Sequence, residues 1–256
     1  MAEVPETLEG WYAMHDFRRF NWPRWKVLPD AERGAVLGEA AEFMRAADLP
    51  HDAQLGSSAF YSVLGHKADL LQLHLRPTLA ALHALKLEFA RTRLADFTEP
   101  AYSYLSVTEL SLYEAYARGG SQDRDALMQQ PFVRRRLFPP IPDATEMPFV
   151  CFYPMNKRRG ETVNWYAAGM EERRQMMRNH ATTGRKYHGR VQQMITGSTG
   201  LDDWEWGVTL FAGDPLDIKK LIYEMRFDEV SAKYADFGAF YVGTRLAPEE
   251  LSAALV

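Results

Sequence analysis

The sequence predicts an α+β fold made of two ferredoxin-like halves, and three observations predict it. Strand-like runs of alternating hydrophobicity are interspersed with amphipathic helical stretches. The order of these elements in the first part of the chain is repeated in the last part. A stretch rich in glycine, proline and charge separates the two parts. Each part has the order β-α-β-β-α-β, which is the ferredoxin-like unit.

The first half begins with an aromatic-rich strand over residues 8–18. Asp30 precedes an alanine-, glutamate- and leucine-rich stretch, which predicts a helix that ends near Ala47. Residues 57–64 and 68–75 alternate as two strands around a turn that contains glycine.

A second helix and a closing strand complete this half. Pro77 suits the first turn of a helix, which we expect to run to about Leu94. Residues 101–112 alternate as a strand. We assign residues 1–113 to an N-terminal ferredoxin-like half with a structural role, because none of its residues is assigned to chemistry.

The second half repeats the pattern. Residues 148–156 predict a strand and residues 170–187 a helix. Two further strands are expected at 190–197 and 204–212, around a turn of glycine and aspartate.

Asp214 and Pro215 supply a cap and a first helical position for a helix that we expect to reach about Val230. Residues 238–246 close this half as a strand, so that residues 148–256 form the C-terminal half. Residues 114–147 are assigned to a linker. Two open sheets leave edges and a face to cover, and packing the two sheets together is the expected solution.

The composition is that of a globular protein without membrane segments: 46% of the residues are hydrophobic and 25% are charged. No apolar run reaches the roughly 18 residues that span a bilayer. The acidic start lacks the basic-then-apolar pattern of a secretory signal. We therefore expect a cytoplasmic protein without a membrane partner.

The chain has a single cysteine, Cys151. It cannot form a disulfide within the chain or a site of several cysteines. Because its neighbours are apolar, we expect a buried, inert thiol.

Charge is unevenly distributed along the chain. Residues 134–190 contain 12 Lys+Arg and 5 Asp+Glu, a net +7, whereas the rest has 18 basic and 29 acidic residues, a net −11. A local basic region in an acidic protein fits an anionic small ligand better than nucleic acid. A solvated helix face with a charged loop is the alternative interpretation.

Among the seven histidines, His180 has the most suggestive surroundings. On the predicted helix, Met176, Met177, Gly184 and Tyr187 share its face, and this small, apolar surface suits a flat macrocycle. One imidazole with a porphyrin makes a complete iron site. A satisfied core histidine is the alternative. The sequence contains no HExxH zinc motif, nucleophile elbow, P-loop or dinucleotide fingerprint.

Tyr153, Met155 and Lys157 alternate along the predicted strand, which aims a phenol, a thioether and an ammonium to one side. An aromatic core residue followed by a charged loop is the alternative. Pro154 confines such a strand to an edge or a bulge. Gln193 lies in a run otherwise suited to burial, where an amide needs a partner or a ligand.

These residues belong to long motifs, which include YPMNKRR, NWY, EERRQMMRNHATTGRKYHGRVQQMITGSTGLDDWEWG and FDEVSAKY. With the weaker match YSYLSVTELSLY, the chain resembles the coproheme decarboxylases of the chlorite dismutase superfamily over most of its length. The resemblance implies a dimeric α+β barrel of two ferredoxin-like repeats in one chain, and a ring of five identical subunits.

The same resemblance implies an oxidoreductase that makes haem b. Its substrate and redox cofactor would be iron coproporphyrin III (coproheme). Hydrogen peroxide would be the oxidant that converts propionates 2 and 4 into vinyl groups. The resemblance also implies transient contact with the ferrochelatase of the pathway. The basic region would bind the four carboxylates.

Site residues follow from the resemblance position by position. His180 matches the iron ligand and Tyr153 the catalytic tyrosine, whose radical would remove a hydrogen from the propionate β-carbon. The other matches are to the porphyrin surroundings: Pro154, Met155, Asn156 and Lys157 along the propionates, Gln193 on the distal side, Ser231 and Arg136 at propionates, and Trp165 in the pocket wall. Arg134 and Arg135 are adjacent alternatives to Arg136. The usual His-Gly is His180-Ala181 here, which should not affect ligation.

Two other functions compete with this one. Chlorite dismutases carry a distal arginine where this chain has Gln193. A haem carrier or sensor would need no oxidisable phenol at the propionates, so Tyr153 with Lys157 favours an enzyme.

Overall fold

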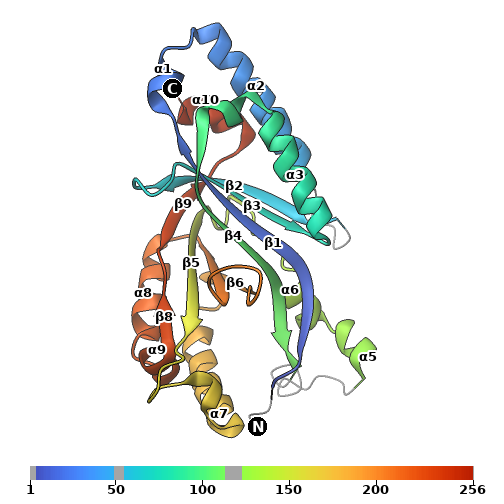
Figure 1. Cartoon of the computed structure of the whole chain (residues 1–256), viewed down its shortest axis with the longest axis vertical. Helices are drawn as coiled ribbons and strands as arrows, with labels where there is room; N and C mark the ends of the chain where they lie inside the picture. Colours follow the sequence, from blue (N-terminus) through green and yellow to red (C-terminus); the bar gives the residue numbers. More distant parts are fainter. Residues whose placement is uncertain (1–3, 49–54, 113–122, 256) are drawn as a thin grey trace.

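The computed structural model describes residues 4–48, 55–112 and 123–255. The strands form the middle of the molecule, with α2 and α3 at one end and α7, α8 and α9 at the other (Figure 1). The elements of the first half are β1 (Thr7–Phe20), α1 (Trp22–Lys26), α2 (Asp30–Ala47), β2 (Ser57–Leu64), β3 (Leu70–Arg76), α3 (Leu79–Arg91), the 3-10 helix η1 (Arg93–Phe97) and β4 (Thr98–Ser111).

The remaining elements follow in the same βαββαβ order, with short helices added. They are α5 (Arg124–Met128), α6 (Pro131–Leu137), β5 (Phe149–Lys157), η2 (Trp165–Ala167), α7 (Met170–Arg185), β6 (Val191–Gly197), β7 (Trp206–Ala212), α8 (Pro215–Met225), α9 (Glu229–Tyr234), β8 (Ala235–Phe237), β9 (Tyr241–Arg245), η3 (Pro248–Glu250) and α10 (Leu251–Ala254). Within the described ranges, no helix combines the length and the apolar character needed to cross a bilayer.

The two halves share one antiparallel sheet. The first half contributes the order β4-β1-β3-β2 and the second β6-β7-β5-β9. Pairing of β4 with β6 and of β2 with β9 joins them edge to edge into a closed ring, with β8 beside the end of β5. The α+β prediction is confirmed. The two sheets also pack together as predicted, since one core cluster contains Phe17 and Leu73 of the first half and Phe152 and Phe211 of the second. They are in addition joined at their edges, because closure satisfies the backbone groups there.

Side chains fill the inside of this ring, and helices cover parts of its outside. Phe17, Leu73, Phe152 and Phe211 are among the buried interior residues. Helices α2 and α3 cover the outer face of the first half, and α8 covers β5 and β7. Because side chains alternate along β5, Phe152 points inward while Tyr153 points outward toward α8.

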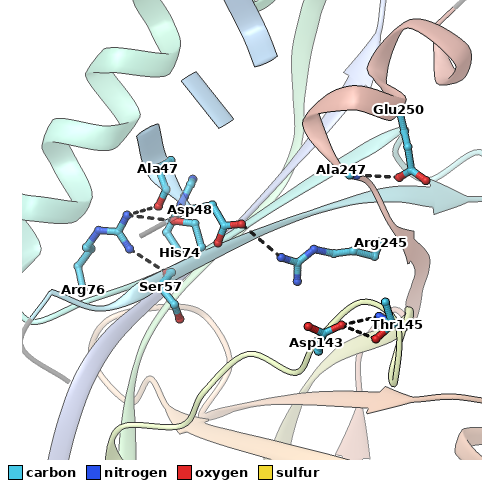
Figure 2. Close-up of polar contacts among 11 residues, drawn as sticks. Ala47, Asp48, Ser57, His74, Arg76, Asp143, Thr145, Arg245, Ala247 and Glu250 are labelled. Atoms are coloured by element: carbon cyan, nitrogen blue, oxygen red, sulfur yellow. Dashed lines mark hydrogen bonds and ion pairs between the residues drawn. The ribbon is translucent and has the colours of Figure 1, made fainter. Parts of the chain in front are cut away.

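Polar contacts fasten α2 to the seam between the halves. Arg76 donates hydrogen bonds to the carbonyl oxygens of Ala47 and Ser57, both at 2.8 Å. Arg245 of β9 forms an ion pair with Asp48 at 3.8 Å (Figure 2). The charges therefore tie a strand of the second half to the end of a helix of the first.

Most element positions agree with the sequence predictions, and two helix boundaries are wrong. Pro77 precedes the cap Thr78 and lies outside α3, which ends at Arg91. The helix predicted to continue to Val230 is two helices. The first ends at Met225, and Asp228 caps the second.

The segment predicted as a linker contains α5 and α6. Their residues Leu127, Val133 and Leu137 are fully buried against Leu8 and Leu110 of the sheet. The glycine pair at residues 119–120, on which part of the linker prediction rested, lies outside the described residues. The segment therefore packs as part of the fold, because its apolar residues recur at helical spacing between the prolines.

Candidate functional site

His180 lies in the third turn of α7 and is held by an aspartate from α9. Its side chain is 26% exposed, and Nδ1 donates to Oδ2 of Asp228 at 2.9 Å. Within the described part of the chain, Nε2 makes no hydrogen bond. An imidazole fixed in this way by a carboxylate presents its second nitrogen as a metal ligand. His180 is thus a polar residue held at a partly open surface, which favours the ligand interpretation over the core one.

Asp228 serves two purposes at once. Its Oδ1 accepts from the backbone N–H groups of Val230 and Ser231, at 3.1 and 3.3 Å, and so caps α9. Its Oδ2 accepts from His180 and from the Ser231 hydroxyl, the latter at 2.8 Å. Partial burial raises the pKa of Asp228, but these hydrogen bonds outweigh it and hold the pKa below its usual value. The group is therefore an ionised acceptor.

Lys157 lies at the end of β5 beside the same aspartate. Its Nζ is 4.9 Å from the centroid of the Trp165 ring. Burial lowers the pKa of Lys157 to about 8, against the attraction of Asp228 and Glu205. Trp165 is buried against Met176 of α7 and Val230 of α9. Four elements, β5, η2, α7 and α9, thus bring Lys157, Trp165, His180 and Ser231 into one region.

Tyr153 is buried in the outer face of β5. Its ring stacks on Phe240 at 4.5 Å between centroids and contacts Phe237 at 5.7 Å. Burial raises the pKa of Tyr153 well above its usual value. The phenol therefore stays protonated at neutral pH, which suits a side chain that releases a proton and an electron together.

Pro154 and Asn156 point to the opposite face of β5. Asn156 Oδ1 accepts from the backbone N–H of Glu205 at 2.7 Å. Pro154 predicted an edge or a bulge. The strand is not at an edge, because β5 has β7 on one side and β9 and then β8 on the other. The pairing on the second side is irregular at Pro154, as the bulge alternative expects, since residues 153–154 of β5 lie opposite the three residues 238–240 between β8 and β9. Pro154 falls in the gap between β9 and β8, where its missing N–H costs no ladder bond. Side-chain contact of these two residues with a porphyrin stays a prediction that this geometry does not favour.

The outer sheet face next to Tyr153 is incompletely covered. The register places Ile195, Val208 and Tyr153 in one row, and Trp206 and Met155 in the next. Ile195, Met155 and Trp206 are partly exposed, because α7 packs mainly against α8 and α9 and not on these strands. This partly open apolar face ends at Lys157, which lies near the aspartate that holds His180, and it fits a flat, apolar ligand.

Gln193 lies on this same face, opposite Leu210 of β7. Its side chain is exposed, so it neither satisfies buried backbone nor fills the core. The sequence context left two possibilities for the Gln193 amide, a buried partner or a ligand. The exposed position agrees with the second.

Arg136 lies on α6, at the β4 side of the same face. Its Nε donates to the carbonyl oxygen of Glu109 at 3.3 Å, and Glu109 accepts from Trp206 Nε1 at 3.0 Å. Arg136 is half-buried, whereas Arg134 and Arg135 are exposed. The placement favours Arg136 among the three arginines.

A separate hollow of about 440 Å³ lies between α8 and strands β5 and β9. Cys151, Ile218, Phe240 and Val242 are among its lining residues, but His180 and Lys157 are not. The expectation of a buried thiol is confirmed, since Cys151 is 2% exposed and burial raises its pKa to about 12.

Sequence reasoning missed Asp228 and Glu205. Glu205 is buried, and it accepts from the Lys157 backbone N–H at 2.9 Å. A helix predicted to run unbroken through residue 228 hid the cap. The run Asp-Glu-Val-Ser after Phe227 is an N-cap signal that would have found it.

Comparison with known proteins identifies the family. The family model described as chlorite dismutase matches residues 25–246. The chain therefore belongs to the chlorite dismutase family.

Within that family, the chain is 46% identical to the coproheme decarboxylase of Staphylococcus carnosus, over 98% of this chain and 97% of that protein. Proteins of Haloquadratum walsbyi and Natronomonas pharaonis that are named as heme-binding are 49% and 48% identical. These matches cover 100% and 98% of this chain, which spans only 48% and 42% of those two proteins.

Solved structures with similar folds agree with this family assignment. A heme-binding protein from Thermus thermophilus superimposes with a TM-score of 0.90 at 44% identity, over 100% of this chain and 98% of that one. A chlorite dismutase mutant from Candidatus Nitrospira defluvii gives 0.76 at 19% identity, over 97% and 96% of the two chains. The latter likeness concerns the fold alone.

Proposed function

We propose that this protein is a coproheme decarboxylase, an oxidoreductase that converts iron coproporphyrin III to haem b with hydrogen peroxide. The observation that carries the proposal is the combination of a carboxylate-held imidazole, His180 on α7, with a buried neutral phenol, Tyr153 on the outer face of β5. The near full-length similarity to the S. carnosus enzyme supports it.

The proposed reaction balances for each of two propionates. One propionate side chain and one hydrogen peroxide give one vinyl group, one carbon dioxide and two waters. The propionate loses a hydrogen from its β-carbon and its carboxyl group, and the peroxide O–O bond is reduced. The bound iron porphyrin supplies the redox centre for this oxidation.

The chain's own residues would hold the substrate. His180 Nε2 would bind the iron, and Asp228 would keep the ring oriented. Lys157 and Arg136 would form charge-assisted hydrogen bonds to carboxylates, and Ser231 would donate its hydroxyl. Met155 and Trp165 would lie against the macrocycle, with Gln193 on the distal side. The net +7 of residues 134–190 suits a substrate with four carboxylates.

Tyr153 would carry out the hydrogen transfer. Because its phenol stays protonated, it gives up its O–H as a proton and an electron. The oxygen then takes a hydrogen from the propionate β-carbon, which restores the O–H. Loss of carbon dioxide together with a second electron, which the redox centre of the bound porphyrin would take up, would then leave the vinyl group. Stacking on Phe240 limits the ring's movement between these events.

We also propose a ring of five identical subunits and a transient contact with the ferrochelatase that supplies coproheme. Both come from the family resemblance. The mass of the particle in solution and co-purification with ferrochelatase test them.

The proposed activity is tested by titrating the coproheme complex with hydrogen peroxide and weighing the porphyrin by mass spectrometry. Two successive losses, each the mass of formic acid, are expected. An unchanged porphyrin would contradict the proposal and favour a carrier. Oxygen release from chlorite, without decarboxylation, would assign the chain to chlorite chemistry despite Gln193.

A further inference from the structure

One carboxylate oxygen connects the proposed iron ligand to a proposed substrate contact. Asp228 Oδ2 accepts both from Nδ1 of His180 at 2.9 Å and from Oγ of Ser231 at 2.8 Å. The other oxygen of Asp228 is occupied by two backbone N–H groups at the start of α9. His180 and Ser231 therefore compete for the negative charge on Oδ2.

The two donors differ in their freedom to leave this oxygen. The Ser231 hydroxyl turns about a single bond and can donate to any acceptor within reach. The His180 ring is carried on α7 and has its second nitrogen directed to the metal in the proposed site. When Ser231 turns away, Oδ2 has one donor fewer, and the charge it offers to the His180 N–H increases.

We propose that Ser231 and Asp228 are positioning residues through which a bound substrate carboxylate strengthens the hydrogen bond on the iron ligand, His180. A carboxylate that takes the Ser231 hydroxyl frees Asp228 to bind the His180 N–H more strongly, which makes the imidazole a stronger electron donor to iron. The inference rests on the proposed function, because it takes His180 as iron ligand and Ser231 as carboxylate contact.

Lys157 strengthens the same effect. Its ammonium lies close enough to Asp228 to feel its charge, and it faces the Trp165 ring. A substrate carboxylate bound by Lys157 would share that ammonium with Asp228. The attraction between Lys157 and Asp228 would then weaken, so that more of the negative charge of Asp228 would act on the His180 N–H.

The consequence is a site that distinguishes porphyrins by their side chains. A porphyrin with a carboxylate at Ser231 would receive a stronger iron–histidine bond than one with an alkyl group there. The iron would thus be activated when a carboxylate is in place. By linkage, the stronger bond would also favour carboxylated porphyrins in binding.

The test compares iron coproporphyrin III with iron etioporphyrin III, which has ethyl groups in place of propionates. The two macrocycles therefore have nearly the same electronic structure and differ in their carboxylates. The readout is the iron–histidine stretching frequency of the ferrous complexes, measured by resonance Raman scattering. In the wild type, the frequency should be higher with coproporphyrin. Ser231→Ala should raise the etioporphyrin value and leave the coproporphyrin value unchanged, which reduces the difference to the part that Lys157 contributes.

Two further variants separate this effect from a structural one. Asp228→Asn keeps an N-cap for α9 and removes the charge, so its frequencies should be low and equal for both porphyrins. Ser231→Thr keeps the hydroxyl and should restore the wild-type difference. Equal frequencies in the wild type, or an undiminished difference in Ser231→Ala, would overturn the inference alone. A band that persists in His180→Ala would contradict the proposed function, and the inference with it.

Discussion

At the residue scale, the site combines groups whose surroundings alter their acidity. Tyr153 and Lys157 lie on one face of β5, and burial keeps the first protonated and eases the loss of a proton from the second. These effects arise from the fold, since the same residues in an exposed strand would titrate normally.

Lys157 gives the binding of carboxylates a dependence on pH. Its pKa of about 8 in the free protein means that the ammonium is lost above that pH, so binding must then take up a proton. Affinity for metal-free coproporphyrin III, followed by fluorescence, should be constant below pH 8 and fall above it by up to about tenfold per pH unit.

Lys157→Arg is the matched control for this prediction. Arginine stays charged throughout the range, so the decline should disappear. The same decline in the arginine variant would show that another group is responsible.

His180 illustrates how much of the site the sequence could predict at this scale. Its position on an apolar helical face was apparent, and the resemblance supplied its proposed role. The contact of His180 with Asp228 could not be predicted from spacing, because 48 residues separate the two. The contact depends on how α9 packs against α7.

At the scale of elements, α6 shows where sequence reasoning fell short. Glycines and prolines predicted a linker over residues 114–147, yet α6 is packed on β1 through buried Val133 and Leu137. Gly10 makes this approach possible, since a β-carbon there would overlap the carbonyl oxygen of Leu137. Close contacts between distant segments leave little trace in local patterns.

Gly10→Ala should therefore destabilise the protein. The alanine methyl must push α6 away from β1, at a cost of about 1–3 kcal/mol in the free energy of unfolding. Urea unfolding measures this value. Gly34→Ala is the control, because Gly34 lies on an exposed helical face with nothing near it.

The control should stabilise α2 by about 0.5–1 kcal/mol through helix propensity. A Gly10 variant as stable as the wild type would mean that α6 is not held against the sheet. That result would also remove the support for the position of Arg136.

At the scale of the whole molecule, closure of the sheet creates an interior that excludes water. The sequence predicted both ferredoxin-like halves from their repeated order, but the pairing of β4 with β6 and of β2 with β9 lies between segments remote in the chain. Edge strands carry no local signal of their partner. Local patterns therefore identified the two halves, and only the family resemblance implied the barrel in which they join.

Two histidines make the closed structure sensitive to acid. His15 is fully buried and contacts Thr209 at 2.8 Å, and burial lowers its pKa to about 3. Burial, with Arg76 nearby, lowers the pKa of His74 to about 3 as well. The unfolded chain binds these protons near pH 6.5, so stability is complete above that pH and is lost as the pH falls toward 3.

Each histidine should contribute roughly 1.4 kcal/mol per pH unit to this loss, well below pH 6.5. Urea unfolding between pH 7 and 4.5 measures the slope. His15→Gln should reduce it by one histidine's share, whereas His83→Gln, on an exposed helical face, should not. An unreduced slope in His15→Gln would contradict the neutral, buried state of that ring.

We propose that Tyr153 makes a decarboxylase of this haem-binding fold, and removal of its one side-chain oxygen atom tests this role most directly. Tyr153→Phe keeps the stacking on Phe240 and should bind coproheme as the wild type does. With hydrogen peroxide, mass spectrometry should show coproheme that keeps all four propionates, and haem b formation slowed by about a hundredfold or more. Haem b formed at the wild-type rate by Tyr153→Phe would contradict the account.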